Sequence, residues 1–266
     1  MHLITVVLLL MVCSFAHSAE PAGCTLRMSA ETDFPPHLIK QDQQWTGLSV
    51  ELMQRLAQEV GCRLTFVHSP WLRALQLSEQ GELDILSHLS VSEQRRAQFA
   101  FIGPHHIESI YLVGDPSQVT APASLQQLAE GADVGSIATL HGAYYGEEFL
   151  RLSQLPPFAN QLVSISSIQD KLALLRAKRV KAILEDISVL HYWQQHKYPD
   201  AERYQPLLKV YESPVYFGFS KASLSVNQLK QLAQAWQRLY QQGELSAIYQ
   251  KYQITPDQQL TPAPLL

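Results

Sequence analysis

Residues 48–67 read LSVELMQRLAQEVGCRLTFV, and two kinds of periodicity follow one another in this segment. Apolar residues recur every three or four positions after Ser49, at Val50, Met53, Leu56, Ala57 and Val60. That spacing predicts a helix with one buried face, and Gly61 is typical of the residue that ends a helix. Residues 63–67 then predict a strand, so the segment favours a fold in which helices and strands alternate.

The flanking sequence continues this alternation. Residues 25–28 predict a strand before the helix, residues 72–79 predict a second helix, and residues 83–86 predict a buried strand. A β-α-β-α-β order calls for a parallel sheet with helices on its faces. We therefore expect an α/β unit in the first half of the chain.

A second alternation begins at Ser124, after a stretch that contains proline and serine. Its expected helices lie at 125–130, 144–152 and from Ser167 onward, and its expected strands at 134–137, 162–165 and 182–184. The C-terminal part differs, because a strand at 215–219 leads into an amphipathic helix that carries Trp236 and that we expect to pack back on the first unit. The predicted first lobe therefore comprises residues 20–109 and 213–266, and the predicted second lobe comprises residues 110–212.

The composition is that of a globular protein. Hydrophobic residues make up 46% of the chain and charged residues 17%, which is enough apolar surface for a folded core. The formal net charge is −4, and no dense stripe of lysine and arginine occurs. Because phosphate backbones bind to concentrated positive charge, this pattern argues against a nucleic-acid-binding protein.

The N-terminus carries an apolar run from Leu3 to Phe15, followed by the small-residue stretch Ala16 to Ala19. The run is too short to span a bilayer comfortably, so residues 1–19 predict a cleaved secretory signal peptide. An uncleaved N-terminal anchor is the alternative. Met11 and Val12 before Cys13 are not the small residues that precede a lipid-attachment cysteine.

Export would leave Cys24 and Cys62 as the cysteines of the mature chain, in a compartment that permits disulfides. Each cysteine stands at the start of a predicted strand. If the two strands are adjacent and parallel, their starts lie within the reach of a disulfide. We predict a Cys24–Cys62 bridge, with two buried free thiols as the alternative.

Several short motifs occur in an order that is informative as a set. They are Phe34-Pro35-Pro36, TGLSVEL at 46–52, Pro70-Trp71-Leu72-Arg73-Ala74-Leu75, Gly81-Glu82-Leu83-Asp84-Ile85, SVSEQR at 90–95 and Phe101-Ile102-Gly103-Pro104. From Cys24 to about Tyr252 the chain resembles the type 2 periplasmic solute-binding proteins, in particular the family that serves polar amino-acid uptake. The resemblance implies an α/β fold with two lobes, each a mainly parallel sheet flanked by helices, with hinge strands between them.

The same resemblance implies a function and a set of partners. The expected protein is a periplasmic monomer that closes its cleft on a small polar molecule, such as an amino acid, and delivers it to a membrane transporter of the ABC type. No cofactor, metal or catalytic residue is expected.

The resemblance also assigns two principal site residues. The segment Ser90 to Arg95 is similar to the T-x-T-x-E-R element, in which the arginine pairs with the ligand carboxylate and the first hydroxyl residue hydrogen-bonds to it. An arginine offers a planar fork that matches a carboxylate. The segment 182–186 resembles a late strand whose terminal aspartate accepts the ligand ammonium group, which assigns that role to Asp186. As alternatives, Arg95 is an ordinary surface arginine and Asp186 an acid at a helix N-terminus.

Further ligand contacts follow from the resemblance. Phe34 matches an aromatic residue that stacks on the ligand, and Trp71 is a second candidate wall, although core packing is the competing interpretation for both. His88 replaces the family's glycine. The remaining expected contacts are Ser87, Glu31, Thr139 and Tyr144.

Enzyme and metal functions have little support in the sequence. There is no nucleophile elbow, phosphate loop or zinc helix. His105 and His106 are adjacent, so in an extended segment they should face opposite ways and make a poor metal pair. Two alternatives remain: an enzyme of the same fold that resembles cyclohexadienyl dehydratase, with Glu185 as an acid, and a sensor module.

Overall fold

The computed structural model of this 266-residue chain describes residues 23–31, 34–254 and 266. The predicted signal peptide at 1–19 lies outside the described residues. Within those ranges, no helix combines the length and the apolar character that a membrane crossing requires.

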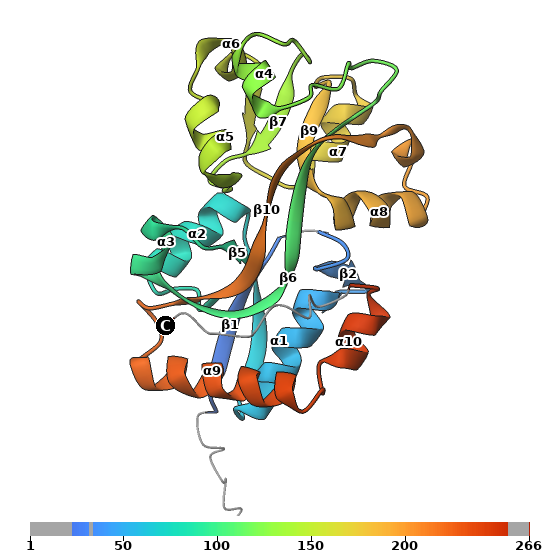
Figure 1. Ribbon diagram of the computed structural model, residues 1–266. Coiled ribbons are helices and arrows are strands. Elements are labelled where there is room, and N and C mark those ends of the chain that lie inside the picture. The colour runs from blue at the N-terminus through green and yellow to red at the C-terminus, as the bar shows by residue number, and fades with distance from the viewer. Residues whose placement is uncertain (1–22, 32–33, 255–265) are drawn as a thin grey trace, which may run out of the picture.

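Eight strands form one mixed sheet in the order β4-β1-β5-β10-β6-β9-β7-β8 (Figure 1). Their bounds are β1 Thr25–Ala30, β4 Arg63–His68, β5 Ile85–Ser90, β6 Phe99–Gly114, β7 Ile137–Leu140, β8 Leu162–Ile165, β9 Ala182–Asp186 and β10 Gln205–Ser220. Strands β4, β1 and β5 are parallel, as are β8, β7 and β9. A small antiparallel pair, β2 Ile39–Gln41 and β3 Gln44–Thr46, lies apart from this sheet.

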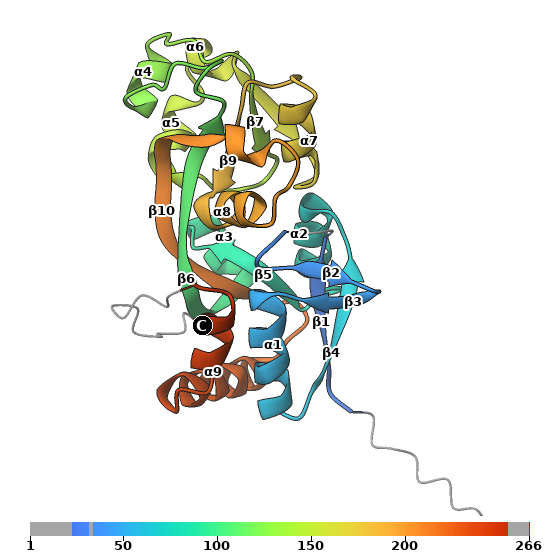
Figure 2. The same cartoon turned by 90° about the vertical axis from the view of Figure 1, so that its right-hand side faces the viewer.

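The two halves of the molecule share the long strands β6 and β10 (Figures 1 and 2). Each has 16 residues, and they pair antiparallel from Gln205↔Gly114 to Ser220↔Phe99. One end of the pair joins β5 and the other joins β9. The predicted lobe boundaries, at 109/110 and 212/213, fall within these two strands and stay a prediction.

Ten α-helices occur in the described ranges. They are α1 Leu48–Glu59, α2 Trp71–Glu79, α3 Glu93–Gln98, α4 Leu125–Ala129, α5 Gly146–Leu152, α6 Pro156–Ala159, α7 Asp170–Arg176, α8 Ile187–Gln195, α9 Val226–Gln241 and α10 Ser246–Lys251. Helices α1 and α9 pack together in the half that contains β1, so the C-terminal segment returns to the first unit (Figure 1). A 3₁₀ helix at Ala201–Arg203 precedes β10.

Local sequence explains how the main helices start. Ser225 caps α9 in a capping box with Gln228, and Ser124 caps α4. Gly47 precedes α1 with a φ of 112°, and a Cβ at this position would lie 2.5 Å from the carbonyl oxygen of His37. Only glycine fits there, so the chain turns at Gly47 and α1 begins at Leu48, before the apolar spacing that the sequence shows from Val50 onward.

The second half shows the largest differences from the predicted elements. The strand expected at 134–137 is β7 at Ile137–Leu140, because Asp133 accepts a hydrogen bond from the Gly135 amide and forms a turn at φ 78°. The helix expected from Tyr144 begins at Gly146. The strand expected at 162–165 is confirmed as β8.

The structure confirms the predicted disulfide. Cys24 and Cys62 are bonded, and their Cα atoms are 4.5 Å apart. They directly precede β1 and β4, whose register begins at Thr25↔Arg63. The cysteines are adjacent because the strands are parallel neighbours.

We expect that replacing both cysteines, C24S/C62S, lowers the free energy of unfolding by about 3–4 kcal/mol, because the bridge closes a loop of 38 residues in the unfolded chain. Urea unfolding of the variant and of the oxidised wild type measures this difference. Reduced wild-type protein is the control and should resemble the variant. Equal unfolding midpoints for the variant and the oxidised wild type would contradict the expectation.

Candidate functional site

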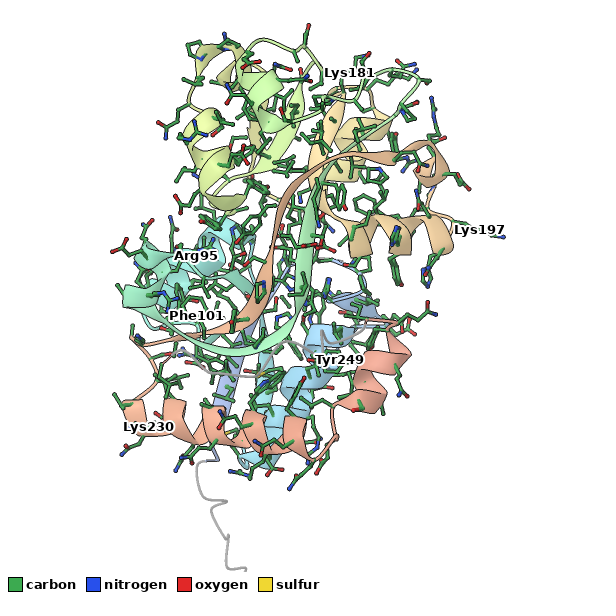
Figure 3. The ribbon with its side chains drawn as sticks, in the orientation of Figure 1. Arg95, Phe101, Lys181, Lys197, Lys230 and Tyr249 are labelled. Atoms are coloured by element: carbon green, nitrogen blue, oxygen red, sulfur yellow. A yellow bond between two sulfur atoms is a disulfide. The ribbon has the colours of Figure 1, made fainter. Side chains whose placement is uncertain are left out.

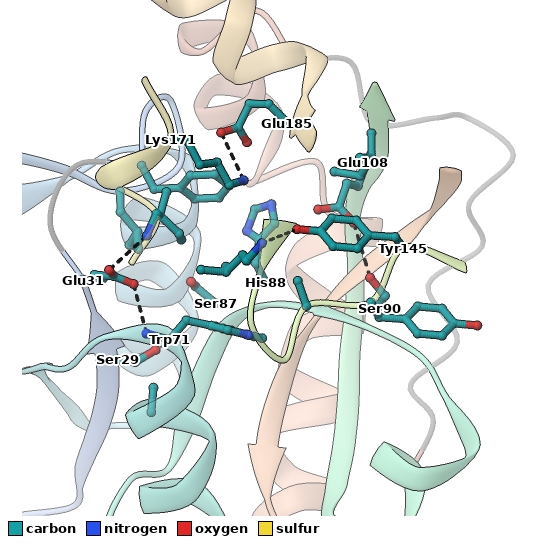
Figure 4. Close-up of a pocket in the computed structure, with 18 of the residues that line it drawn as sticks. Ser29, Glu31, Trp71, Ser87, His88, Ser90, Glu108, Tyr145, Lys171 and Glu185 are labelled. Carbon is teal, nitrogen blue, oxygen red and sulfur yellow. Dashed lines mark hydrogen bonds and ion pairs between the residues drawn. The ribbon is translucent and has the colours of Figure 1, made fainter. Parts of the chain in front are cut away.

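A pocket lies between the two halves (Figure 4). Its lining from the β1 half comprises Ser29, Glu31, Phe34, Leu38, Ser69, Trp71, Ala74, Ser87, His88, Ser90 and Arg95. Strand β6 contributes Glu108 and Ile110, and the other half contributes Leu140, Ala143, Tyr144, Tyr145, Ile168, Lys171 and Glu185. The strand ends and helix starts that meet here are where α/β sheets bind ligands.

Arg95 lies in the short helix α3, in the half of the molecule that holds β1 (Figure 3). Its half-buried guanidinium donates hydrogen bonds to the carbonyl oxygens of Ser90 and Gly142, each at 3.0 Å. Burial lowers the pKa of this group from its usual value. No ion pair of Arg95 occurs among the described residues. Its positive charge therefore faces the cleft with only neutral hydrogen-bond partners.

Glu108 shares a hydrogen-bond partner, Ser90, with Arg95. Ser90 Oγ donates a hydrogen bond to Glu108 Oε2 at 3.3 Å, so Arg95 and Glu108 both contact Ser90. Burial, together with the negative charge of Asp186, raises the pKa of Glu108 to about 8. Glu108 is therefore mostly protonated at neutral pH in the empty cleft.

Lys171 and Glu185 form a buried ion pair on the opposite wall (Figure 4). Lys171 Nζ lies 3.2 Å from Glu185 Oε2, and the two side chains are 6% and 1% exposed. Burial acts to lower the pKa of Lys171, but the neighbouring carboxylate of Glu185 outweighs it and the pKa is raised. The pair therefore neutralises itself, whereas neither Arg95 nor Glu108 has an ion-pair partner among the described residues.

Glu31 connects the two walls of the pocket. Its carboxylate accepts hydrogen bonds from the amide of Trp71 at 3.0 Å and from the amide of Ile168 at 3.2 Å, and Ser167 Oγ also donates to it. Arg95 makes a second connection through the carbonyl of Gly142. Hydrogen bonds of Glu31 and Arg95 thus join the two walls of the cleft directly.

The turn at Gly142 is shaped for this contact. Its φ is 76°, and a Cβ there would lie 3.3 Å from Leu75 and 3.6 Å from the indole nitrogen of Trp71. The absence of a side chain lets the backbone of one half lie against α2 of the other.

Most of the predicted contacts line the pocket. They are Arg95, Ser90, Phe34, His88, Ser87, Trp71, Glu31 and Tyr144. Thr139 is not among the lining residues, whereas its neighbour Leu140 is. The roles proposed for these side chains toward a ligand stay predictions.

Asp186 is also absent from the lining. Its carboxylate caps α8, where it accepts hydrogen bonds from the amide of Ser188 at 2.7 Å, from Ser188 Oγ, and from the amide of Ser109 at 2.9 Å. Successive side chains of a strand point to opposite faces, so in β9 Glu185 faces the pocket and Asp186 faces away. Asp186 is thus an acid at a helix N-terminus in this structure, and its role toward a ligand ammonium group stays a prediction.

Sequence reasoning missed Glu108, Lys171 and Tyr145. Two of them carried a signal. Glu108 interrupts the largely apolar segment 99–113, and Lys171 lies three residues after Ile168 and directly before Leu172, in the predicted helix that starts near Ser167. A charge inside an apolar pattern indicates either a buried partner or a functional site. Tyr145 gave no such signal; its hydroxyl accepts a hydrogen bond from the Leu140 amide at 2.9 Å.

The expectation for His105 and His106 was wrong. The rings do not face opposite ways, because their Nδ1 atoms lie 2.7 Å apart. The β6–β10 register shifts here: Ile102 pairs with Phe217, but His106 pairs with Val215. The extra residues on β6 form a bulge that includes Gly103-Pro104, and a bulge re-aims the side chains that follow it.

Comparisons with known proteins agree with this architecture. The chain is 22% identical over 185 residues to the putative ABC transporter arginine-binding protein 2 of Escherichia coli (strain K12), which covers 69% of this chain and 71% of that protein. A solved ancestral arginine-binding protein bound to arginine superposes with a TM-score of 0.73 at 19% identity, covering 86% of this chain and 97% of the other. A histidine kinase sensor domain with similarity to periplasmic binding proteins gives 0.71 at 20% identity, covering 86% and 95%.

These superpositions confirm the predicted α/β fold of the periplasmic-binding-protein type. The family profile described as bacterial extracellular solute-binding proteins, family 3, matches residues 26–255, which is most of the chain. The resemblance inferred from the motifs is confirmed, and this protein belongs to the bacterial extracellular solute-binding proteins of family 3.

Proposed function

We propose that the cleft binds a free α-amino acid without changing it chemically and presents it to a membrane transporter of the ABC type. The observation that carries the proposal is the placement of Arg95 and Glu108 on Ser90. Within the part of the chain that the structure describes, the guanidinium of Arg95 has no carboxylate partner and can bind the carboxylate of a zwitterion. The carboxyl group of Glu108 has no cation in contact there and can bind the ammonium group.

Arg95 is the proposed partner of the ligand carboxylate. Its hydrogen bonds to Ser90 and Gly142 use one terminal nitrogen each. A planar guanidinium has five N–H donors, so further donors are free to bind a carboxylate. The ligand would add a charge-assisted pair to these neutral carbonyl contacts, and such a pair is stronger in a partly desolvated cleft.

Glu108 is the proposed partner of the ligand ammonium group, in place of Asp186. An ammonium group favours the ionised carboxylate, so binding would lower the raised pKa of Glu108 and release its proton. Ser90 contacts Arg95 through its carbonyl oxygen and Glu108 through its hydroxyl group, and this hydroxyl oxygen can accept a further hydrogen bond from the ammonium group.

The ligand side chain would lie between aromatic walls. Phe34, Trp71, Tyr144 and Tyr145 all line the pocket. Aromatic faces accept aliphatic chains, rings and guanidinium groups. Because one relative is named an arginine-binding protein, we place arginine first in a screen of free amino acids.

Closure of the two halves is the proposed mode of capture. Two contacts across the cleft join them around the pocket: Arg95 with Gly142, and Glu31 with Ser167 and Ile168. All are hydrogen bonds that water can replace in an open form, so an equilibrium between open and closed forms costs little. A ligand that contacts both walls shifts this equilibrium toward the closed form.

A cleft enzyme is the second candidate, because Glu108 retains its proton near neutral pH. Such a carboxyl group can act as a general acid on a leaving hydroxyl group. Glu185, the acid considered from the sequence, is paired with Lys171 and is less suited to this role. Incubation with prephenate and arogenate tests it: an aromatic product that E108Q does not form would establish catalysis and refute binding alone.

We expect R95A to weaken amino-acid binding by about 3 kcal/mol, roughly 100-fold, because it leaves a carboxylate unpaired in the cleft. Titration calorimetry with the best ligand of the screen measures the loss. The exposed neighbour Arg96 provides the control, since R96A should bind as the wild type does. An unchanged affinity in R95A refutes the proposed site.

Ligand binding at pH 7 should release up to about one proton from Glu108, whose pKa in the empty cleft is about 8. The binding enthalpy should therefore differ between phosphate and Tris buffers, which take up protons with different heats. Affinity should also rise as the pH increases from 6 to 8, because less work is then needed to ionise Glu108. Both effects should disappear in E108Q, and equal enthalpies in the two buffers for the wild type would contradict this role.

Glu108 should also make the ligand-free protein less stable as pH rises. The folded pKa of about 8 exceeds the usual value of 4.5, so between these values the folded state holds a proton that the unfolded chain has lost. The free energy of unfolding must fall across this window. E108Q should therefore gain stability relative to wild type between pH 5 and pH 8, by about 1–3 kcal/mol for this half-buried group. Urea unfolding at both pH values would show no such gain if Glu108 were ionised when folded.

A further inference from the structure

Four histidines meet beside the pocket, where the β1–β2 connection, β5 and β6 come together. They are His37, His88, His105 and His106. His37, His105 and His106 are at most 2% exposed, and His88 also lines the cleft (Figure 4). The ring centroids of His37, His88 and His106 lie 4.3 to 4.8 Å apart. Nothing in the proposed binding of an amino acid requires this cluster.

The hydrogen bonds of His105 determine which nitrogen of His106 is free. His105 Nε2 lies 3.0 Å from the carbonyl oxygen of Ser87, which only accepts, so Nε2 carries the proton of His105. Its Nδ1 is then an acceptor, and His106 Nδ1 donates to it at 2.7 Å. His106 Nε2 is left with a lone pair, and it is buried without a hydrogen-bond partner.

A second chain of hydrogen bonds fixes His37 in the same way. Ser188 Oγ donates its proton to the carboxylate of Asp186, so it accepts from His37 Nε2 at 3.1 Å. His37 Nδ1 therefore has the free lone pair, and it too is buried without a partner. Metal-binding histidines usually donate a hydrogen bond from the nitrogen that does not bind the metal, and this bond orients the ring. Here His37 Nε2 donates to Ser188, which in turn donates to the carboxylate of Asp186.

His88 completes the group. Both of its ring nitrogens are buried without a hydrogen-bond partner. Burial lowers the pKa of His37, His88 and His106 well below the usual value, and the neighbouring histidines lower it further, so all three rings are neutral. Unpartnered buried nitrogens cost free energy, and three of them in one place call for a shared partner.

We propose that His37 Nδ1, His106 Nε2 and one ring nitrogen of His88 bind a divalent transition-metal ion of the class that prefers imidazole ligands, with Zn²⁺ as the probe. One ligand atom from each residue lies within 4.8 Å of the others. Tetrahedral zinc with Zn–N distances of about 2.0–2.1 Å requires nitrogens roughly 3.4 Å apart, so the rings need to move together by about 1 Å. Three histidines leave a fourth position, as in open zinc sites.

Metal binding can be measured with the metal alone, so this inference does not rest on the proposed amino-acid ligand. Purified protein, stripped of metal with EDTA, should bind one equivalent of Zn²⁺ in titration calorimetry. Co²⁺ in its place should give the visible absorption of a tetrahedral site. X-ray absorption of the zinc form should show imidazole nitrogens at about 2.0–2.1 Å. A stripped protein that binds no Zn²⁺ overturns the proposal.

Two variants test the ligands separately. H88Q should lower Zn²⁺ affinity at least about 100-fold, and S188A, which removes only the partner of His37, should lower it about 10-fold. Thermal melting without metal shows whether each variant folds. If H88Q does not fold, S188A still tests the site. Two exposed histidines provide the control, His191 on α8 and His196 directly after it, because H191Q/H196Q should bind as the wild type does. Loss of binding in that control, or full binding in both H88Q and S188A, refutes the site.

Discussion

The antiparallel pairing of β6 with β10 is the constraint on which the rest of this structure depends. Because both strands run through the two halves, their paired backbone carries side chains directly into the space between them. Glu108 and His106 enter the interior from β6 for this reason, although a carboxyl and an imidazole are costly to bury. Other polar groups contact these two side chains: Ser90 donates a hydrogen bond to Glu108, and His105 accepts one from His106.

Charge in the cleft is divided into satisfied and unsatisfied groups. Lys171 with Glu185, and Glu31 with its amide donors, are complete without a solute. Arg95 and Glu108 have only neutral contacts and respond in opposite ways: burial lowers the pKa of the arginine and raises that of the acid. Near neutral pH only the shift of Glu108 changes a charge, because the guanidinium stays protonated, and the ammonium group of a zwitterion would favour the ionised form of Glu108.

The alternation of helices and strands, the disulfide and the position of Arg95 beside the pocket were predictable from the sequence, because these depend on periodicity and on a local motif. The position of Asp186 outside the pocket lining was not, since the face of a strand reverses with a single residue and β9 places Glu185 in the pocket. The histidine cluster was equally hidden. It needs a bulge after Ile102 and the return of a segment that carries His37, and neither leaves a periodic trace in the sequence.

Asp186, which sequence reasoning placed in the cleft, is instead linked to the histidine cluster through Ser188. Asp186 and Ser188 stand at the start of α8, whereas His37 stands just before β2 in the chain. Figure 2 shows α8 and β2 in different halves of the molecule. The hydrogen bond between Ser188 and His37 thus crosses between the halves, like that between Arg95 and Gly142. A cation on His37 would strengthen that bond by polarising its Nε2–H group. Any solute that also favours the closed arrangement would then bind cooperatively with the metal, since both stabilise the same form.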